Sequence, residues 1–134
     1  MFPANTKILV VDDMNSIRTF MVSALKELNY MNIVEASDGA GAWKIINDAA
    51  SGPEPIQLVF SDMMMPEMTG LELLKKVRDC PGTQSLPFLF VTSEGETDAV
   101  LAAATLKADG YVLKPMDKEV ITIQMERVWK RRSP

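Results

Sequence analysis

Short apolar runs alternate with longer amphipathic segments along the whole chain. The runs are rich in Val, Ile, Leu and Phe and lack the strict polar alternation of a half-exposed strand. Unbroken runs of this kind are typical of strands that are covered on both faces. They predict strands over residues 7–11, 32–36, 55–61, 86–91 and 110–113.

Between these runs, apolar residues recur with the spacing of an amphipathic helix. The first such segment follows Asp13 and has Asn15 as its expected N-cap. Its expected buried face consists of Ile17, Phe20, Met21, Ala24, Leu25 and Leu28. Further helices are expected after Asp38, after Thr69, over residues 97–107 and after Asp117. The last of them is expected to be capped by Asp117 and to run through Ile121, Ile123, Met125, Val128 and Trp129.

The alternation predicts a doubly wound α/β fold in which five parallel strands carry five helices. The elements fill the chain without a linker or an internal repeat. We therefore expect a single domain over residues 1–134, with its core at about residues 7–129 and no output domain. Residues 130–134 look unfolded, and we interpret their three basic side chains as complements of a helix dipole rather than as a docking segment.

The composition excludes several kinds of chemistry. The 134 residues include no histidine and one cysteine, Cys80. His-ligated zinc, Ser-His and Cys-His nucleophile pairs and an internal disulfide framework are therefore excluded. Fourteen Lys and Arg against 18 Asp and Glu give a net charge of −4, which argues against a general nucleic-acid or anionic-membrane binder.

The termini and apolar stretches predict a soluble protein. The first residues lack the basic start and apolar core of a secretory signal. The apolar stretches are shorter than the roughly 20 residues that cross a bilayer. We therefore expect a cytoplasmic protein. We also expect a monomer, because no long exposed apolar seam is evident.

Polar residues stand where four of the predicted strands end. Asp12 and Asp13 follow the first strand, and Asp62 follows the third. Thr92 follows the fourth strand and Lys114 the fifth. In an open α/β sheet the carboxyl ends of the strands form the ligand-binding edge. The sequence therefore predicts that three carboxylates, a hydroxyl and an ammonium converge there.

Three carboxylates so close together would raise one another's pKa unless a cation lies among them. A hard divalent cation with oxygen ligands resolves this repulsion, and Mg²⁺ suits a site that also holds phosphoryl oxygens. Any one of these acids, taken alone, could equally be a helix cap rather than a metal ligand. For Asp12 and Asp13 that explanation is weaker, because Asn15 is available for capping.

At this point the motifs resemble those of a known family, the receiver domains of two-component response regulators. The resemblance rests on residues 10–13 (VVDD), 59–66 (VFSDMMMP), 91–93 (VTS) and 110–115 (GYVLKP), together with Gly70. It runs in order over nearly the whole chain, and it is strongest to the stand-alone chemotaxis regulators. The family fold is flavodoxin-like, with the strand order 2-1-3-4-5.

The resemblance implies a role for each residue at the strand ends. Asp62 would be the phosphoacceptor of a chemotaxis-type histidine kinase. Asp13 and Asp62, with the backbone carbonyl of Met64, would hold Mg²⁺, and Asp12 would support the ion directly or through water. Lys114 would pair with a phosphoryl oxygen. The Lys114–Pro115 bond would be cis.

The resemblance also implies a switch rather than an enzyme. Thr92 would bond a phosphoryl oxygen, and Tyr111 would turn inward. The face of the fourth helix, fifth strand and fifth helix would then change and bind a flagellar motor switch protein. A phosphatase is a further candidate partner.

The sequence departs from these relatives beside the phosphoacceptor. Met64 stands where chemotaxis regulators often carry asparagine, so we expect an altered lifetime of the phosphorylated state, with Glu94 as another polar group near the hydrolytic water. Tyr111, judged by its chemistry alone, could equally be a packed core aromatic rather than a switch residue.

Three other functions remain open. A phosphorelay shuttle, or a regulator of a non-flagellar target, would use the same site. A Mg²⁺-dependent phosphatase would use Asp62 as nucleophile, although such enzymes usually have a second aspartate at the position of Met64. A flavodoxin-like cofactor carrier would need a phosphate-cradling loop, which the sequence lacks.

Overall fold

A computed structural model describes residues 1–93, 95, 97–114 and 117–133. Five parallel strands form one sheet in the order β2-β1-β3-β4-β5, which confirms the predicted fold. The strands are β1 (Ile8–Val11), β2 (Ile33–Ala36), β3 (Leu58–Ser61), β4 (Phe88–Thr92) and β5 (Gly110–Leu113). The helices are α1 (Asn15–Glu27), α2 (Gly39–Ala50), α3 (Gly70–Asp79), α4 (Thr97–Thr105) and α5 (Lys118–Arg132).

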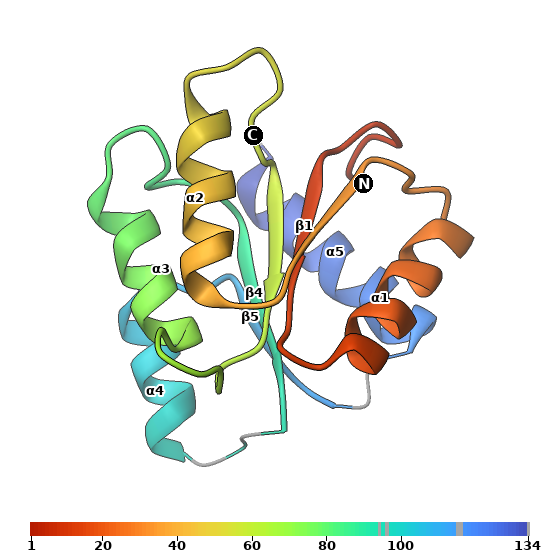
Figure 1. Cartoon of the computed structure of the whole chain (residues 1–134). Coiled ribbons are helices and arrows are strands. Elements are labelled where there is room, and N and C mark those ends of the chain that lie inside the picture. Colours follow the sequence, from red (N-terminus) through yellow and green to blue (C-terminus); the bar gives the residue numbers. More distant parts are fainter. Residues whose placement is uncertain (94, 96, 115–116, 134) are drawn as a thin grey trace.

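The helices cover both faces of the sheet. Figure 1 shows α1 and α5 on one side and α2, α3 and α4 on the other. Successive strand residues point to opposite faces, so Ile8 and Val10 join the core under α1 and α5. Leu9 and Val11 join the core under the other three helices. This two-sided burial explains why the strands are apolar without alternation.

The helix starts expected after Asp38, Thr69 and Asp117 and at residue 97 are confirmed, whereas the predicted N-cap of the first helix is wrong. Asp117 caps α5 by accepting a hydrogen bond from the Val120 amide, and Thr69 forms a capping box with Glu72. Asn15, predicted as a cap, is instead the first residue of α1, and the N-cap is Met14 without a side-chain bond. The Asn15 amide oxygen accepts a bond from the Arg18 guanidinium instead.

Two apolar residues of the expected helices are about half exposed. Phe20 is 50% exposed and Ile123 is 48% exposed. Phe20 lies about 100° from the buried Met21 around the helix axis, which places it beyond the edge of the stripe that packs on the sheet. The expected core positions Met21, Leu25 and Met125 are buried as predicted.

Both ends of the chain pack more than the sequence predicts. Residues 130–132 are not unfolded but form the last turn of α5. At the other end, Phe2 is buried, its ring lies 5.2 Å from the ring of Trp129, and its carbonyl accepts a bond from the Tyr30 hydroxyl. Among the described residues, no helix combines the length and the apolarity that crossing a membrane requires.

Candidate functional site

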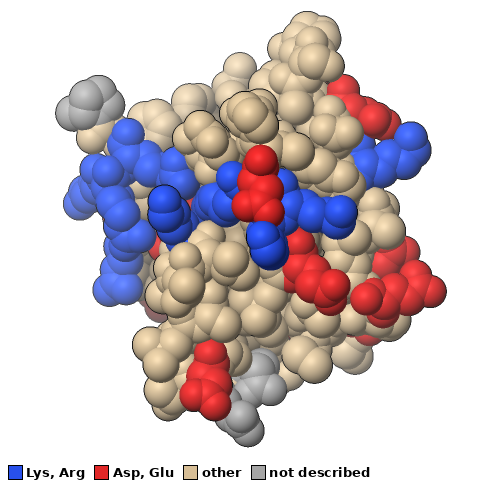
Figure 2. Space-filling model, turned by 90° about the vertical axis from the view of Figure 1, so that its left-hand side faces the viewer, with Lys and Arg blue, Asp and Glu red and all other residues tan. Residues whose placement is uncertain are grey.

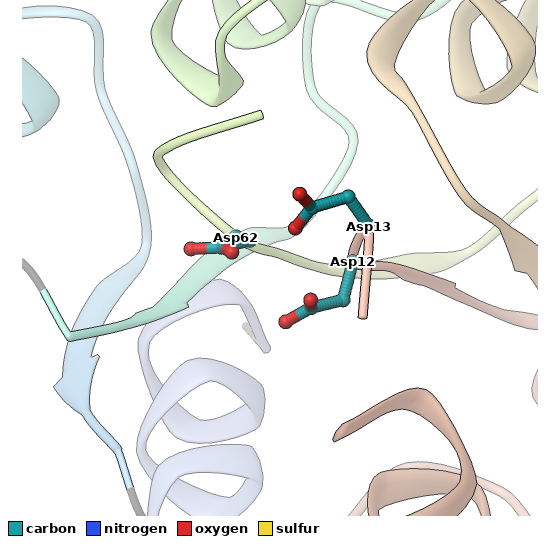
Figure 3. A group of neighbouring side chains, drawn as sticks. All are labelled: Asp12, Asp13 and Asp62. Carbon is teal, nitrogen blue, oxygen red and sulfur yellow. The ribbon is translucent and has the colours of Figure 1, made fainter. Parts of the chain in front are cut away.

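Parallel strand pairing brings the predicted site residues to one edge of the sheet. Asp12 and Asp13 leave the end of β1, and Asp62 leaves the end of β3 beside it. The Asp62 amide donates to the Val11 carbonyl at 2.9 Å, which continues the β1–β3 ladder to the site. Figure 3 shows the Asp13 carboxylate pointing toward Asp62, with Asp12 close by.

The backbone that follows β3 fixes the orientation of Asp62. One carboxylate oxygen, Oδ1, accepts the amide of Met63 at 2.8 Å and that of Met64 at 3.5 Å. The other oxygen, Oδ2, lies 3.3 Å from the Nζ of Lys114. The side chain of Asp62 is 8% exposed. Its two oxygens are therefore held in different environments, one by backbone amides and one by an ammonium.

Asp12 is the most deeply buried acid of the group. Its Oδ2 pairs with Lys114 Nζ at 2.8 Å, and its Oδ1 accepts the Met14 amide at 2.9 Å. The backbone carbonyl of Asp12 accepts a bond from Arg18 at 2.6 Å. These bonds fix Asp12 and tie the loop after β1 to α1.

Lys114 links the fifth strand to the acids of the first and third. Its amide donates to the Thr92 carbonyl at 2.9 Å, which anchors the backbone at the end of β5. Burial alone would lower the pKa of Lys114, but hydrogen bonds and charge from Asp12 and Asp62 outweigh it and raise the pKa above its ordinary value. The lysine is therefore a fixed positive charge at neutral pH.

The three acids are able to hold a metal ion. Asp12, Asp13 and Asp62 each offer a carboxylate oxygen, and these oxygens lie within 4.8 Å of one another. One ammonium offsets only one of three negative charges, which leaves two in excess. Asp13 is exposed and gives the group an open side. Hard oxygen donors and a double negative charge fit a divalent cation.

Comparison with known proteins agrees with this geometry. Residues 8–126 match the response regulator receiver domain. The chain belongs to the response regulator receiver family. It is therefore a phosphoacceptor response regulator of a two-component system.

Named relatives of this receiver domain are chemotaxis proteins. It is 34% identical over 125 residues to the chemotaxis protein CheY of Pseudomonas aeruginosa. This alignment covers 93% of this chain and 97% of the relative. A CheY homolog of Campylobacter jejuni is 34% identical over 91% of each chain. The structure of Vibrio cholerae CheY4 superimposes with a TM-score of 0.80 at 30% identity and covers 92% of this chain and 98% of its own.

The remaining predicted residues of the receiver domain lie around the acids. Thr92 is fully buried at the end of β4. Tyr111 is partly buried on β5, with its ring 6.1 Å from that of Phe90, so it packs against the core as the alternative interpretation expects. Met64 is 60% exposed. Glu94 and Pro115, including the Lys114–Pro115 bond, lie outside the described residues.

Two residues that support the site were not predicted. Arg18 holds the Asp12 carbonyl and pairs with Glu35 at 3.3 Å. Ser61 donates its hydroxyl to the Asp62 carbonyl at 2.9 Å. A polar residue at the end of the buried β3 was the available signal for Ser61, and a basic residue in the second turn of α1 was the signal for Arg18.

Proposed function

We propose that the protein is a magnesium-dependent phosphoryl switch in which Asp62 is the phosphoacceptor. The proposal rests on the position of the Asp62 carboxylate, which is held by backbone amides on one oxygen and faces Lys114 with the other. This arrangement aims a nucleophile at a site where positive charge is already in place. The protein acts on itself and does not turn over a metabolite.

The phosphoryl group comes from a phosphohistidine on a partner kinase. An oxygen of Asp62 attacks phosphorus, the P–N bond to the histidine breaks, and the released imidazole takes a proton from solvent. Lys114 offsets the negative charge of the phosphoryl oxygens. Mg²⁺, held by Asp13, Asp62 and the Met64 carbonyl with Asp12 in support, would allow the anionic nucleophile and the anionic phosphoryl group to meet.

Thr92 and Tyr111 are proposed to carry the change to the surface. The Thr92 hydroxyl bonds a phosphoryl oxygen and draws the end of β4 inward, after which Tyr111 moves further into the core. The signalling face is that of α4, β5 and α5. The exposed apolar side chains of these elements include Leu101 at 59% and Leu113 at 54%, and they offer contact area to a partner.

The proposed target is a protein of the flagellar motor switch, reached in the cytoplasm. The likeness to chemotaxis proteins supports this target over a phosphorelay partner, because three named relatives share the chemotaxis title. The phosphatase alternative is less well supported, because such enzymes usually have a second aspartate at the position of Met64.

The test uses beryllofluoride, which mimics the aspartyl phosphate. Binding of a purified flagellar motor switch protein is measured with and without Mg²⁺ and beryllofluoride, with Asp62→Asn as the control. We expect tight binding only for the activated wild type. Equal binding in every condition would contradict the switch, and steady hydrolysis of a phosphomonoester would instead favour the phosphatase.

A matched pair of surface variants tests the face. Leu101→Ser removes an exposed apolar side chain from α4, and Phe20→Ser removes a similarly exposed one from α1. Leu101→Ser should weaken binding of the motor protein, whereas Phe20→Ser should leave it unchanged. The reverse order would place the signalling face on α1.

A further inference from the structure

Basic residues gather at the edge of the sheet opposite the phosphoacceptor. The last turns of α3 and α5 end there, and Lys107, two residues after the end of α4, joins them. The basic residues of this cluster are Lys76, Arg78, Lys107, Lys130, Arg131 and Arg132. Figure 2 shows a band of Lys and Arg across the face that carries α3 and α4.

The positive charge of this cluster exceeds what the fold needs. Buried Asp109 pairs with Arg78 at 3.2 Å and with Arg132 at 2.7 Å. Each helix end adds about half a negative charge. Asp79 also lies here, but Lys75 pairs with it at 2.8 Å. With that pair included, seven positive charges against two carboxylates and three helix ends leave an excess of about three to four, in a chain whose net charge is −4.

Lys107 occupies a backbone conformation that favours a different residue. Its φ is 65°, in the left-handed region. Its amide donates to the Ala104 carbonyl, and the Ala108 amide donates to the Ala103 carbonyl, which is the pattern that ends a helix with glycine in this position. A lysine here costs stability without a described packing gain, and such costs concentrate at functional positions.

Two neighbouring cavities open beside this cluster. The first, of about 610 Å³, is lined by three basic residues, Arg78, Lys107 and Arg132, and by one acidic residue, Asp79. Asp79 is paired with Lys75 at 2.8 Å. The second, of about 380 Å³, is mainly apolar, with Ile56 and Leu86 in its lining. Gln84 and Ser85 line both cavities, so the two lie side by side along the loop between α3 and β4, and together they are called the groove.

The loop between α3 and β4, residues 80–87, is held in place by hydrogen bonds before any ligand binds. Arg78 donates to the carbonyls of Gln84 at 3.1 Å and Leu86 at 2.6 Å. The Thr83 hydroxyl donates to the Val77 carbonyl at 2.8 Å. A groove that is already ordered loses little conformational entropy when it is filled.

We propose that this groove, half basic and half apolar, binds an acidic, leucine-containing segment of a partner protein. Carboxylates of the segment lie against Lys107 and the exposed part of Arg132, and an apolar side chain enters the cavity beside Ile56 and Leu86. The site is separate from the phosphoacceptor edge and does not depend on phosphorylation.

The groove fits this partner better than other anions. Single-stranded nucleic acid is held by stacking on aromatic side chains, and the described linings of the two cavities contain none. A membrane surface requires large exposed apolar residues beside the basic ones. None of the exposed large apolar residues among those the structure describes lines either cavity.

The test is an NMR titration of the full chain with a short synthetic peptide of alternating glutamate and leucine. We expect amide shifts at residues 82–86 and 105–109, binding that weakens with salt, and the same affinity for Asp62→Asn. A tighter complex with a uridine oligonucleotide or with anionic vesicles would overturn the choice of partner. Shifts spread evenly over the surface would overturn the site.

Matched charge variants complete the test. Lys107→Asn with Lys130→Gln removes two charges from the cluster, and asparagine tolerates the left-handed backbone at position 107. Lys26→Gln with Lys44→Gln removes two charges elsewhere. The first pair should weaken peptide binding up to about fivefold, as expected for the loss of one exposed ion pair at Lys107 and of the longer-range attraction of Lys130. Equal weakening by both pairs would overturn the proposal.

Discussion

Replacing Gly70 with alanine should damage both the stability and the phosphoacceptor site. A Cβ at this position would lie 2.2 Å from the Asp62 carbonyl oxygen, 2.7 Å from a ring carbon of Phe90 and 3.0 Å from the Met63 Cα. Two of these three atoms belong to the backbone, so the clash cannot be relieved by rotating a flexible side chain. Gly70 therefore allows the start of α3 to pack directly behind Asp62.

The expected cost follows from this overpacking. Forcing extra atoms into a packed core costs about 1–3 kcal/mol, and the backbone contacts place Gly70→Ala at the upper end. Alanine regains up to about 1 kcal/mol through its helix propensity. A net loss of roughly 2 kcal/mol would lower the Tm by about 7 °C in a chain of this length.

Gly82→Ala is the matched control, because a Cβ there meets nothing within 4 Å. We expect its Tm to equal or slightly exceed that of the wild type, since alanine reduces the entropy of the unfolded chain. Both variants are compared by thermal unfolding followed by circular dichroism. Beryllofluoride affinity should also fall for Gly70→Ala, because the Asp62 backbone must shift. Equal Tm values for the two variants would refute the steric argument.

Three further predictions concern other parts of the molecule. Asp109→Ala leaves two arginines without their buried partner and should cost about 3 kcal/mol in urea unfolding; a loss below that of an exposed aspartate variant would contradict this. Burial raises the pKa of Tyr30 above 10.0, so its stabilising effect is complete below pH 10 and is lost as pH rises through the folded pKa. Ultraviolet titration of Tyr111→Phe should show that late midpoint, and a midpoint at or below 10.0 would contradict it. Met64→Asn should shorten the lifetime of the phosphorylated state about fivefold by bonding the hydrolytic water, and an unchanged phosphate-release rate would exclude that role.

The elements and the location of the site were predictable from the sequence. Unbroken apolar runs require cover on both faces, and a parallel sheet with helices on both sides provides it. Because parallel strands end at one edge, Asp12, Asp62 and Lys114 could be expected to meet there. The strand order itself came from the family resemblance, since periodicity does not distinguish one order from another.

Local patterns were less informative about residues at the margins of elements. Phe20 fits a loose apolar spacing, but only packing on the curved sheet decides how wide the buried stripe is. No apolar residue follows Trp129, so the sequence predicted an unfolded tail. Arg131 and Arg132 nevertheless continue α5, because both bind Asp109 more than twenty residues away.

The sequence by itself determined the alternation of strands and helices, the exclusion of histidine chemistry and the set of polar residues at the strand ends. Those features depend on side-chain type and on spacing along the chain. The tertiary structure decided which groups touch: Lys114 reaches past β4 and β3 to pair with Asp12, 102 residues away, and Arg78 and Arg132 share Asp109. Such contacts depend on the order of the strands and the crossing of the helices, which no local pattern encodes.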